Sequence, residues 1–296
     1  MNFILGCMKL CDQGGAEAAI EAALAIGITR LDTADIYGAG ASERAIGAAL
    51  AAHPSWRSQL SIQTKFGIRP GDPTTYRQDG DYVCASVEGS LKRLGIDRID
   101  SLLIHRPDPL ADYFATGSAL MRLMEEGTIG RVGVSNMHEH QIALWRRVIP
   151  VSANQIELSL AHHAFVDVDV DVNRVDQHHD FPTGLLPYCM THGIEIQAYS
   201  PLAGGVFSGA ADGPENMTGH ALADTRACVA RIAAEAGAEP AAVVLAWLLR
   251  HPAGIVPVVG SANPERIATF ESAARLRLSR EQWYELYVAA RGRPLP

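Results

Sequence analysis

Short apolar runs alternate with longer amphipathic, alanine-rich runs along almost the whole chain. The short runs have the length of buried β-strands, and the longer runs repeat their apolar residues at helical spacing. Capping residues separate the two kinds of run: Gly27 and Gly95 are predicted to end helices, and Ser42 and Asn263 to begin them. The predicted strands lie within residues 2–6, 28–32, 60–64, 99–104, 130–136, 152–159, 194–200 and 255–260. The predicted helices lie within residues 16–27, 42–53, 82–94, 114–126, 141–147, 184–191, 221–236 and 240–249, with two more beginning at 264 and 280.

This alternation of strands and helices predicts a parallel sheet. Eight strand–helix pairs within 296 residues favour closure into a (β/α)8 TIM barrel, a single α/β domain that spans residues 1–296. An open doubly wound sheet is the alternative, but no GxGxxG motif follows the first strand. In a barrel the carboxyl ends of all strands share one face, so reactive residues at several strand ends would converge.

Three successive predicted strands do end in such residues. The second strand leads into LDTADIYG, which places Asp32 and Tyr37 at its exit. The third strand ends in IQTKFG and presents Lys65, and the fourth ends in LLIHRP and presents His105. The chain has 3 lysines against 22 arginines, so Lys65 stands out in its own sequence. A lysine ammonium is a compact cation that can tune the pKa of a neighbour.

Composition limits the partners. The formal net charge is −8, and no run of Lys or Arg offers a footprint for nucleic acid or an anionic membrane. No apolar run reaches the roughly 18 residues that a membrane span requires. The five cysteines are odd in number and lack metal spacing, so we expect free thiols in a reducing cytosol. These features predict a soluble, cytoplasmic protein with a small-molecule partner.

Seven motifs together carry a family resemblance. They are, in chain order, LDTADIYG, IQTKFG, LLIHRPDP, GRVGVSN, NQIELS, QAYSPLAGG and VVGSANPERI. With these motifs at these spacings, the chain resembles the aldo-keto reductase family, and within it the bacterial NADP-dependent oxidoreductases. The resemblance implies an NADPH-dependent reduction of an aldehyde or ketone to an alcohol, with NADH as the second candidate cofactor. It leaves the physiological substrate, the reaction direction, the stereochemistry and the oligomeric state open.

The resemblance also implies a catalytic tetrad of Asp32, Tyr37, Lys65 and His105. A phenol has an ordinary pKa near ~10, so we expect Lys65 to lower the pKa of Tyr37. Asp32 would hold Lys65 charged, and Tyr37 would protonate the carbonyl oxygen. His105 would hydrogen-bond the same oxygen. The hydride must come from a cofactor, because no side chain donates one.

For the cofactor, the resemblance implies that Ser135, Asn136 and Gln155 bind the nicotinamide carboxamide and that Tyr199 stacks on the ring. The SPLAGG loop is expected to fold over the pyrophosphate, and Arg266 to face the adenosine 2'-phosphate. The predicted cofactor-binding residues are Gly6, Cys7, Ser135, Asn136, Gln155, Tyr199, Ser200, Pro201, Leu202, Gly260, Ser261, Asn263 and Arg266.

The sequence departs from the family pattern at three places. Gly260 stands where many members carry a lysine against the 2'-phosphate, and Phe270 stands where an adenine-binding amide is common. Both changes keep NADH open as a cofactor. The chain also begins almost at its first strand, without the hairpin that usually closes the barrel floor. We expect residues 1–4 to serve partly in its place, or the true start to lie upstream.

Two other functions remain as hypotheses. A non-catalytic nicotinamide-binding regulatory or redox-sensing subunit would bind the cofactor without turnover. A metal-dependent hydrolase would need a metal site, for which His162, His163, His178 and His179 with Asp167, Asp169 and Asp171 are the candidates. Their spacing fits no compact ligand set, so we predict a polar loop here and no metal.

Substrate recognition is expected from the variable loops at residues 69–81, 162–182 and 206–219. Arg106 directly follows His105. It would suit an anionic substrate, although a solvent-facing arginine beside Asp108 is the favoured interpretation.

Overall fold

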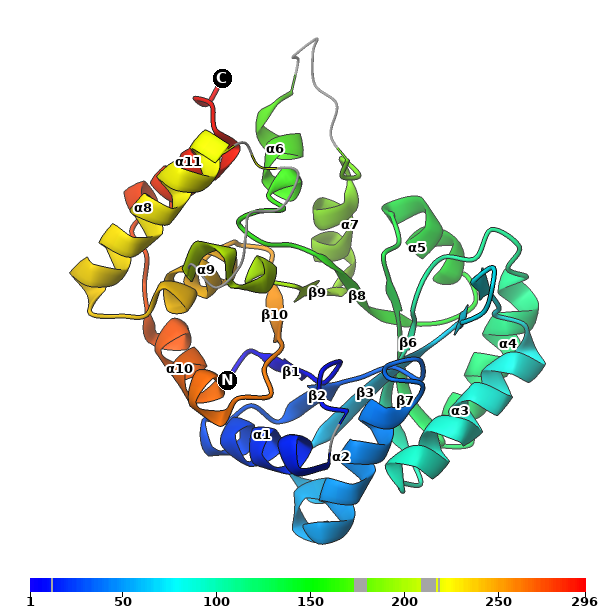
Figure 1. Cartoon of the computed structure of the whole chain (residues 1–296). Coiled ribbons are helices and arrows are strands. Elements are labelled where there is room, and N and C mark those ends of the chain that lie inside the picture. Colours follow the sequence, from blue (N-terminus) through cyan, green and yellow to red (C-terminus); the bar gives the residue numbers. More distant parts are fainter. Residues whose placement is uncertain (12, 173–179, 209–216, 218) are drawn as a thin grey trace.

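Eight parallel strands close into a barrel, as the sequence predicts. The computed structural model describes residues 1–11, 13–172, 180–208, 217 and 219–296. The strands follow one another around the barrel in the order β1-β10-β9-β8-β7-β6-β3-β2, and β2 pairs with β1 to close the ring (Figure 1). Their bounds are β1 Ile4–Gly6, β2 Arg30–Asp32, β3 Ser61–Phe66, β6 Ile99–Ile104, β7 Ile129–Ser135, β8 Val151–Glu157, β9 Glu195–Tyr199 and β10 Val256–Val259.

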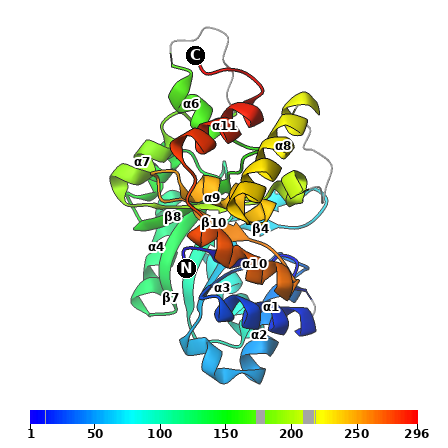
Figure 2. The same ribbon diagram turned by 90° about the vertical axis from the view of Figure 1, so that its left-hand side faces the viewer.

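Helices surround this barrel on its outside (Figure 1). Their bounds are α1 Gln13–Ala25, α2 Ala41–Ala52, α3 Gly80–Leu94, α4 Tyr113–Glu125, α5 Glu139–Trp145, α6 Ala164–Val170, α7 Leu185–His192, α8 Gly219–Ala236, α9 Pro240–Leu249, α10 Pro264–Arg275 and α11 Arg280–Arg291. The helices α8 and α11 pack side by side along one flank (Figure 2). No single helix among the described residues is long and apolar enough to cross a membrane. Only α8 and α9 taken together have the necessary length and apolar composition, and this pair is bent by 96°.

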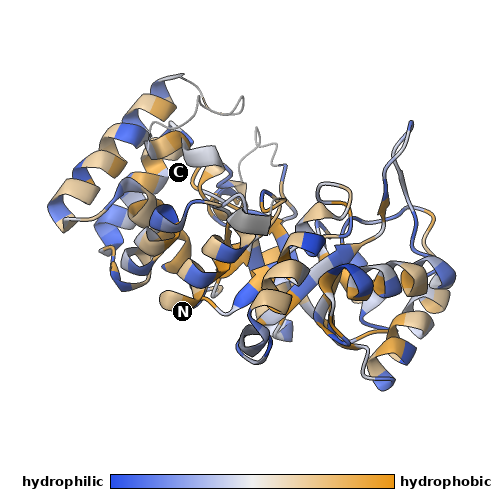
Figure 3. Ribbon diagram, turned by 60° about the horizontal axis from the view of Figure 1, so that its bottom comes forward, coloured by the Kyte–Doolittle hydropathy of each residue, from blue (hydrophilic) through white to orange (hydrophobic). Residues whose placement is uncertain are grey.

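The apolar core lies mainly between the strands and the helices. Hydrophobic residues cover the central strands, and hydrophobic and hydrophilic residues alternate around the outer helices (Figure 3). Trp145, Phe165 and Trp247 are among the largest side chains that are fully buried there. Burial of an aliphatic or aromatic side chain of this kind contributes about 1.5–3 kcal/mol. The barrel interior is divided: Ile4, Val256 and Val258 form a small apolar cluster, while the side near β2, β3, β8 and β9 is polar.

The helix boundaries confirm most predicted caps and correct one. Gly95 ends α3 in the left-handed conformation, and the Asn263 side chain caps α10 by accepting from the N–H of Arg266. The prediction that Ser42 caps α2 is wrong. That helix begins at Ala41 after Gly40, whose φ of 82° makes the turn. The Ser42 hydroxyl is buried and instead donates to the Cys7 carbonyl at 2.7 Å.

The structure contains elements that the sequence pattern did not predict. They are a hairpin of β4 Ile68–Arg69 and β5 Thr75–Tyr76, two 3-10 helices at Pro54–Ser58 and Ala203–Ser208, and the helix α6. The prediction of a polar loop is therefore wrong over residues 164–170. Asp167 on α6 and Asp171, which directly follows the helix, both face α11. Asp171 pairs with Arg291, and the Tyr287 hydroxyl donates to Asp167 at 2.5 Å.

Candidate active site

Three of the four predicted catalytic residues form a continuous hydrogen-bonded chain. Lys65 lies near the end of β3 and is fully buried. Its Nζ donates to Asp32 Oδ2 at 2.7 Å, to the carbonyl of Thr33 at 2.8 Å and to the hydroxyl of Tyr37 at 3.3 Å. An ammonium group has three hydrogens, so these three acceptors use all of them. The ammonium is thereby fixed against the phenol.

The loop after β2 brings Tyr37 over Lys65. Gly38, Ala39 and Gly40 follow with φ values of 56°, 51° and 82°, so the chain turns through three left-handed residues in succession. A Cβ on Gly38 would lie 2.8 Å from the Cys11 sulfur, which excludes a larger residue there without a shift. The Ser42 hydroxyl holds the other side of the loop through the Thr33 hydroxyl at 2.8 Å. The local sequence thus dictates where the phenol lies.

The charges of this chain correct one expectation. Burial is the largest single influence and would lower the pKa of Lys65, but the charge of Asp32, Tyr37 and the hydrogen bonds to both together outweigh it and the pKa is raised. Burial also raises the pKa of Tyr37, and the ammonium of Lys65 offsets only part of that rise. The expectation that Lys65 brings the pKa of Tyr37 below its ordinary value is therefore wrong for the protein alone. At neutral pH the site holds a charged lysine beside a protonated phenol.

His105 lies beside Tyr37 at the end of β6. The two rings meet edge to face with their centroids 5.8 Å apart. Burial, together with the positive charges of Lys65 and Arg106, lowers the pKa of His105 to about 3. Its Nδ1 is buried and has no hydrogen-bond partner among the described residues. The imidazole is therefore neutral at physiological pH and carries one N–H to donate.

Asp32 is also held from below by three buried glutamines, which we call the glutamine ladder: Gln63 on β3, Gln155 on β8 and Gln197 on β9. Gln63 Nε2 and Gln155 Nε2 donate to Asp32 Oδ1 at 2.7 and 2.9 Å. Both also donate to Gln197 Oε1, at 2.8 and 3.0 Å. Sequence reasoning missed Gln63 and Gln197. The signal was their even spacing from Lys65 and Tyr199, which places polar side chains on the interior face of otherwise apolar strands.

The residues predicted to bind the nicotinamide carboxamide come together at the ends of β7, β8 and β9. The Ser135 hydroxyl donates to the Gln155 carbonyl at 2.8 Å. Asn136 has a φ of 57°, and its Nδ2 donates to Ser135 Oγ at 2.8 Å. The Tyr199 hydroxyl donates to Asn136 Oδ1 at 3.0 Å. Burial raises the pKa of Tyr199, and a hydrogen bond with the Arg106 guanidinium offsets part of that rise.

Arg106 follows His105 and lies near Tyr199. Its carbonyl accepts from the buried Gln78 Nε2 at 2.6 Å, which fixes the backbone after His105. The carboxylate of Asp108 accepts from the N–H of Leu110 at 2.9 Å. Arg106 is half-buried and lies close enough to Tyr199 to affect the pKa of that phenol, and the interpretation of a solvent-facing arginine stays a prediction.

The predicted phosphate region lies around the ends of β1, β9 and β10. Ser200, Ala203, Gly204 and Gly205 all have positive φ, so the SPLAGG loop is tightly coiled. Leu202 is half-buried and Pro201 is buried. Gly6 and Gly260 approach each other closely, since a Cβ on Gly6 would lie 3.7 Å from the Gly260 Cα.

Beyond this loop, the first turn of α10 is exposed on the surface. The Ser261 hydroxyl accepts from the N–H of Asn263 at 3.0 Å, and Arg266 is exposed on the first helical turn. An open hollow of about 630 Å³ is lined by Ala262, Asn263, Pro264 and Glu265. These residues fit a phosphate at a helix N-terminus.

Cys7 and Phe270 do not present side chains to this region. Cys7 is fully buried; its thiol donates to the Leu5 carbonyl, and its N–H donates to the Asp32 carbonyl at 2.7 Å. Phe270 packs in the core. Because the thiol and the N–H of Cys7 already donate within the protein, the predicted contact of Cys7 with the cofactor would be a van der Waals contact, and it stays a prediction.

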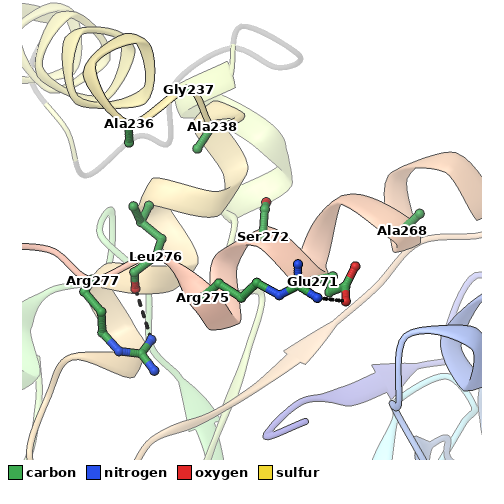
Figure 4. A pocket seen from close by; sticks show the side chains of 9 residues that line it. All are labelled: Ala236, Gly237, Ala238, Ala268, Glu271, Ser272, Arg275, Leu276 and Arg277. Atoms are coloured by element: carbon green, nitrogen blue, oxygen red, sulfur yellow. Dashed lines mark hydrogen bonds and ion pairs between the residues drawn. The ribbon is translucent and has the colours of Figure 1, made fainter.

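A second hollow, of about 420 Å³, lies between the turn that joins α8 to α9 and the helix α10, and no tetrad residue lines it (Figure 4). Its lining residues are Ala236, Gly237, Ala238, Ala268, Glu271, Ser272, Arg275, Leu276 and Arg277. Arg275 pairs with Glu271, and Arg277 donates to the Ala274 carbonyl at 2.7 Å. The charged side chains that line this hollow thus already interact with other groups of α10.

The structure gives no support to a metal centre. Among the residues that it describes, no three His, Cys, Asp or Glu side chains gather closely enough to hold an ion. His163 Nδ1 lies 2.9 Å from Asp167 Oδ2, within the contacts of α6 with α11. His178 and His179 lie outside the described residues.

Comparison with known proteins agrees with this geometry. A model of the aldo/keto reductase family matches residues 4–289. A 6-dehydroglucose reductase from Agrobacterium fabrum is 40% identical over 287 residues, which cover 94% of this chain and 88% of that protein. A second 6-dehydroglucose reductase, from Novosphingobium aromaticivorans, is 36% identical over 303 residues, with 98% and 92% covered. The crystal structure of an aldo-keto reductase from Klebsiella pneumoniae in complex with NADPH is 26% identical with a TM-score of 0.75, covering 99% of this chain and 91% of that one. The chain therefore belongs to the aldo/keto reductase family of oxidoreductases.

Proposed function

We propose that the protein reduces the aldehyde group of a sugar to an alcohol, with NADPH as hydride donor and Tyr37 as proton donor. The observation that carries this proposal is the buried chain from Asp32 through Lys65 to Tyr37 at the barrel mouth. Family membership makes the protein an NAD(P)H-dependent oxidoreductase. The two relatives named 6-dehydroglucose reductase support a sugar aldehyde as the substrate class.

The residues at the mouth fit a nicotinamide dinucleotide. The Gln155 amide donates twice to the barrel interior, which leaves its oxygen as the acceptor for a carboxamide N–H. The guanidinium of Arg266 makes no hydrogen bond or ion pair with another described residue, so it is available to a 2'-phosphate. This arginine favours NADPH, while Gly260 in place of a lysine keeps NADH as the weaker alternative. When bound, the cofactor supplies the hydride.

The protein's own groups then handle the proton. Because its pKa is raised, Tyr37 keeps its proton at neutral pH and serves as a general acid toward the carbonyl oxygen. The Lys65 ammonium, 3.3 Å away, stabilises the phenolate that proton transfer leaves behind. Neutral His105 donates its N–H to the same oxygen and orients the carbonyl. Asp32 keeps the ammonium in place throughout.

The test is oxidation of NADPH and NADH in the presence of a panel of aldehydes that includes 6-dehydroglucose. We expect turnover with NADPH, and a loss of about 10²- to 10⁴-fold in kcat for Tyr37→Phe with NADPH affinity retained. Tyr284→Phe on α11 is the matched control and should keep full activity. If Tyr37→Phe turns over like wild type, Tyr37 is not the proton donor.

A non-catalytic nicotinamide-binding sensor is the second candidate. Such a protein would bind NADPH tightly and reduce none of the aldehydes. The saturated hydrogen bonding of Lys65 argues against it, because a binding subunit has no need of an ammonium held against a phenol. Tight binding without turnover in wild type would establish it.

A further inference from the structure

Two charged pairs bracket the glutamine ladder. At the barrel floor, where the strands begin, Arg30 donates to both oxygens of Glu195 at 2.8 and 2.6 Å. Burial opposes ionisation of Glu195, but Arg30 and Gln197 lower its pKa below the ordinary range. At the mouth, Lys65 pairs with Asp32 at 2.7 Å. The ladder crosses the barrel between these pairs, because β3 and β9 lie on opposite sides of the ring, as do β2 and β8 (Figure 1).

The carboxylate of Glu195 fixes the direction of the first amide. Gln197 Nε2 donates to Glu195 Oε1 at 2.8 Å. A carboxylate only accepts, so a flipped Gln197 would set oxygen against oxygen. The oxygen of Gln197 must therefore face Gln63 and Gln155, and both donate to it.

The orientation of the Gln197 amide also determines the orientation of the amides of Gln63 and Gln155. Gln197 Nε2 also donates to Gln63 Oε1 at 3.0 Å, so Gln63 and Gln197 form a reciprocal amide pair. With their nitrogens turned toward Gln197 Oε1, Gln63 and Gln155 direct their remaining hydrogens at Asp32 Oδ1. All three glutamines are at most 4% exposed, so water does not compete for these bonds.

We infer that Gln197 is a positioning residue for the reaction: it orients Gln63 and Gln155 so that both donate to Asp32 and so that the Gln155 oxygen is left for the cofactor. The buried amide of Gln197 thereby orients two parts of the site: the Asp32–Lys65–Tyr37 chain and the Gln155 oxygen that accepts from the carboxamide. The kinetic part of this inference rests on the proposed function.

The test is Gln197→Met, which keeps the length of the side chain and removes its polar atoms. We expect kcat to fall by about 10- to 100-fold with the aldehyde KM within a few-fold, because small displacements of catalytic groups have effects of this size. We expect the Kd for NADPH to rise about tenfold, since the amide of Gln155 loses one of the two acceptors that hold its orientation and keeps only Asp32 Oδ1. The alkaline limb of the kcat profile should move to lower pH, because a loosened Asp32 no longer supports the raised pKa of Lys65.

Val256→Ala is the matched control. Val256 pairs in register with Gln197 and packs in the apolar half of the interior. It should lower the melting temperature and leave kcat, the NADPH Kd and the alkaline limb unchanged. The double variant Gln63→Met with Gln197→Met should lose less kcat than the product of the fold-losses in the two single variants, because the two amides act as one pair.

The outcomes separate the two proposals. Absence of turnover in wild type contradicts the proposed function, and the NADPH Kd of Gln197→Met still tests the ladder. A higher NADPH Kd for Gln197→Met than for wild type supports the inference. An NADPH Kd equal to that of Val256→Ala overturns it. If wild type turns over and Gln197→Met behaves like Val256→Ala in kcat, Kd and pH profile, the inference is wrong.

Discussion

A phenol beside an ammonium would be expected to lose its proton readily, yet Tyr37 holds it. The reason is the balance of two opposed effects, of which burial is the larger: burial favours the neutral phenol, and the charge of Lys65 favours the phenolate. Burial prevails in the protein alone. This balance suits reduction, in which the phenol must arrive at the substrate with its proton in place.

The same balance predicts the pH dependence of catalysis. His105, with a pKa of about 3, does not titrate near neutrality, and the raised values for Tyr37 and Lys65 remove both from that range. Asp35, next to the tetrad, has a pKa raised to about 7 by burial and by Glu43. In Asp35→Asn we therefore expect kcat/KM for reduction to be flat from about pH 5 to pH 9. A limb near 6.5 in this variant that disappears on His105→Asn would contradict the neutral imidazole.

Asp35 also predicts how stability depends on pH. A carboxyl with a raised pKa binds its proton more tightly in the folded state, so the free energy of unfolding falls as pH rises from about 4 to about 7 and is then constant. The free energy of unfolding of Asp35→Asn, relative to wild type, should rise by about 2–3 kcal/mol between pH 5 and pH 8. Urea unfolding at the two pH values measures it. An unchanged difference between Asp35→Asn and wild type at the two pH values would refute the assignment to Asp35.

At the scale of elements, α6 shows where sequence patterns fail. The run AFVDVDV has the period of a strand rather than of a helix, and its acidic residues suggest a loop. Its helical state follows from contacts with α11, more than a hundred residues later in the chain. Asp171 is fully buried between Arg291 and Arg293, and it lies 2.7 Å from the latter. No local pattern contains that information.

These contacts predict a large effect for one substitution. Arg291→Met leaves Asp171 and Asp167 buried with less compensation, so we expect a loss of about 3 kcal/mol in the free energy of unfolding. Hydrogen exchange of residues 164–170 should accelerate more than that of β6. Arg231→Met on α8, which breaks exposed pairs only, should lower the free energy of unfolding far less than Arg291→Met does. Adding Asp171→Asn to Arg291→Met should recover part of the loss; a further loss would mean that the pair does not anchor α6.

Other parts of the fold follow from local information. The strands could be predicted because each is a short buried run between capping residues, and Asn263 could be assigned as a cap because Pro264 and the following turn belong to the same few residues. Ser42 misled because a serine before a helical run is normally a cap, whereas here the positive φ of Gly40 starts the helix one residue earlier. Its hydroxyl is used to hold the active-site loop instead.

At the scale of the whole molecule, the closed barrel explains why the tetrad was easier to predict than the ladder beneath it. Asp32, Lys65 and His105 sit at the ends of β2, β3 and β6, which are neighbours in the barrel, so order along the chain places them together. Gln63 and Gln197 meet across the barrel, 134 residues apart. Only closure brings them into contact, and the charges of Glu195 and Asp32 decide which way their amides face.

The pairing of β1 with β10 bears on how the protein is made. The first strand to leave the ribosome stays unpaired on one edge until residue 259, the end of the last strand, has been synthesised. The three reactive groups of the hydrogen-bonded chain are all encoded before residue 66, so a nascent chain carries them long before it carries Gln155, Gln197 or Arg266. The active site is therefore complete only after Arg266 has been synthesised.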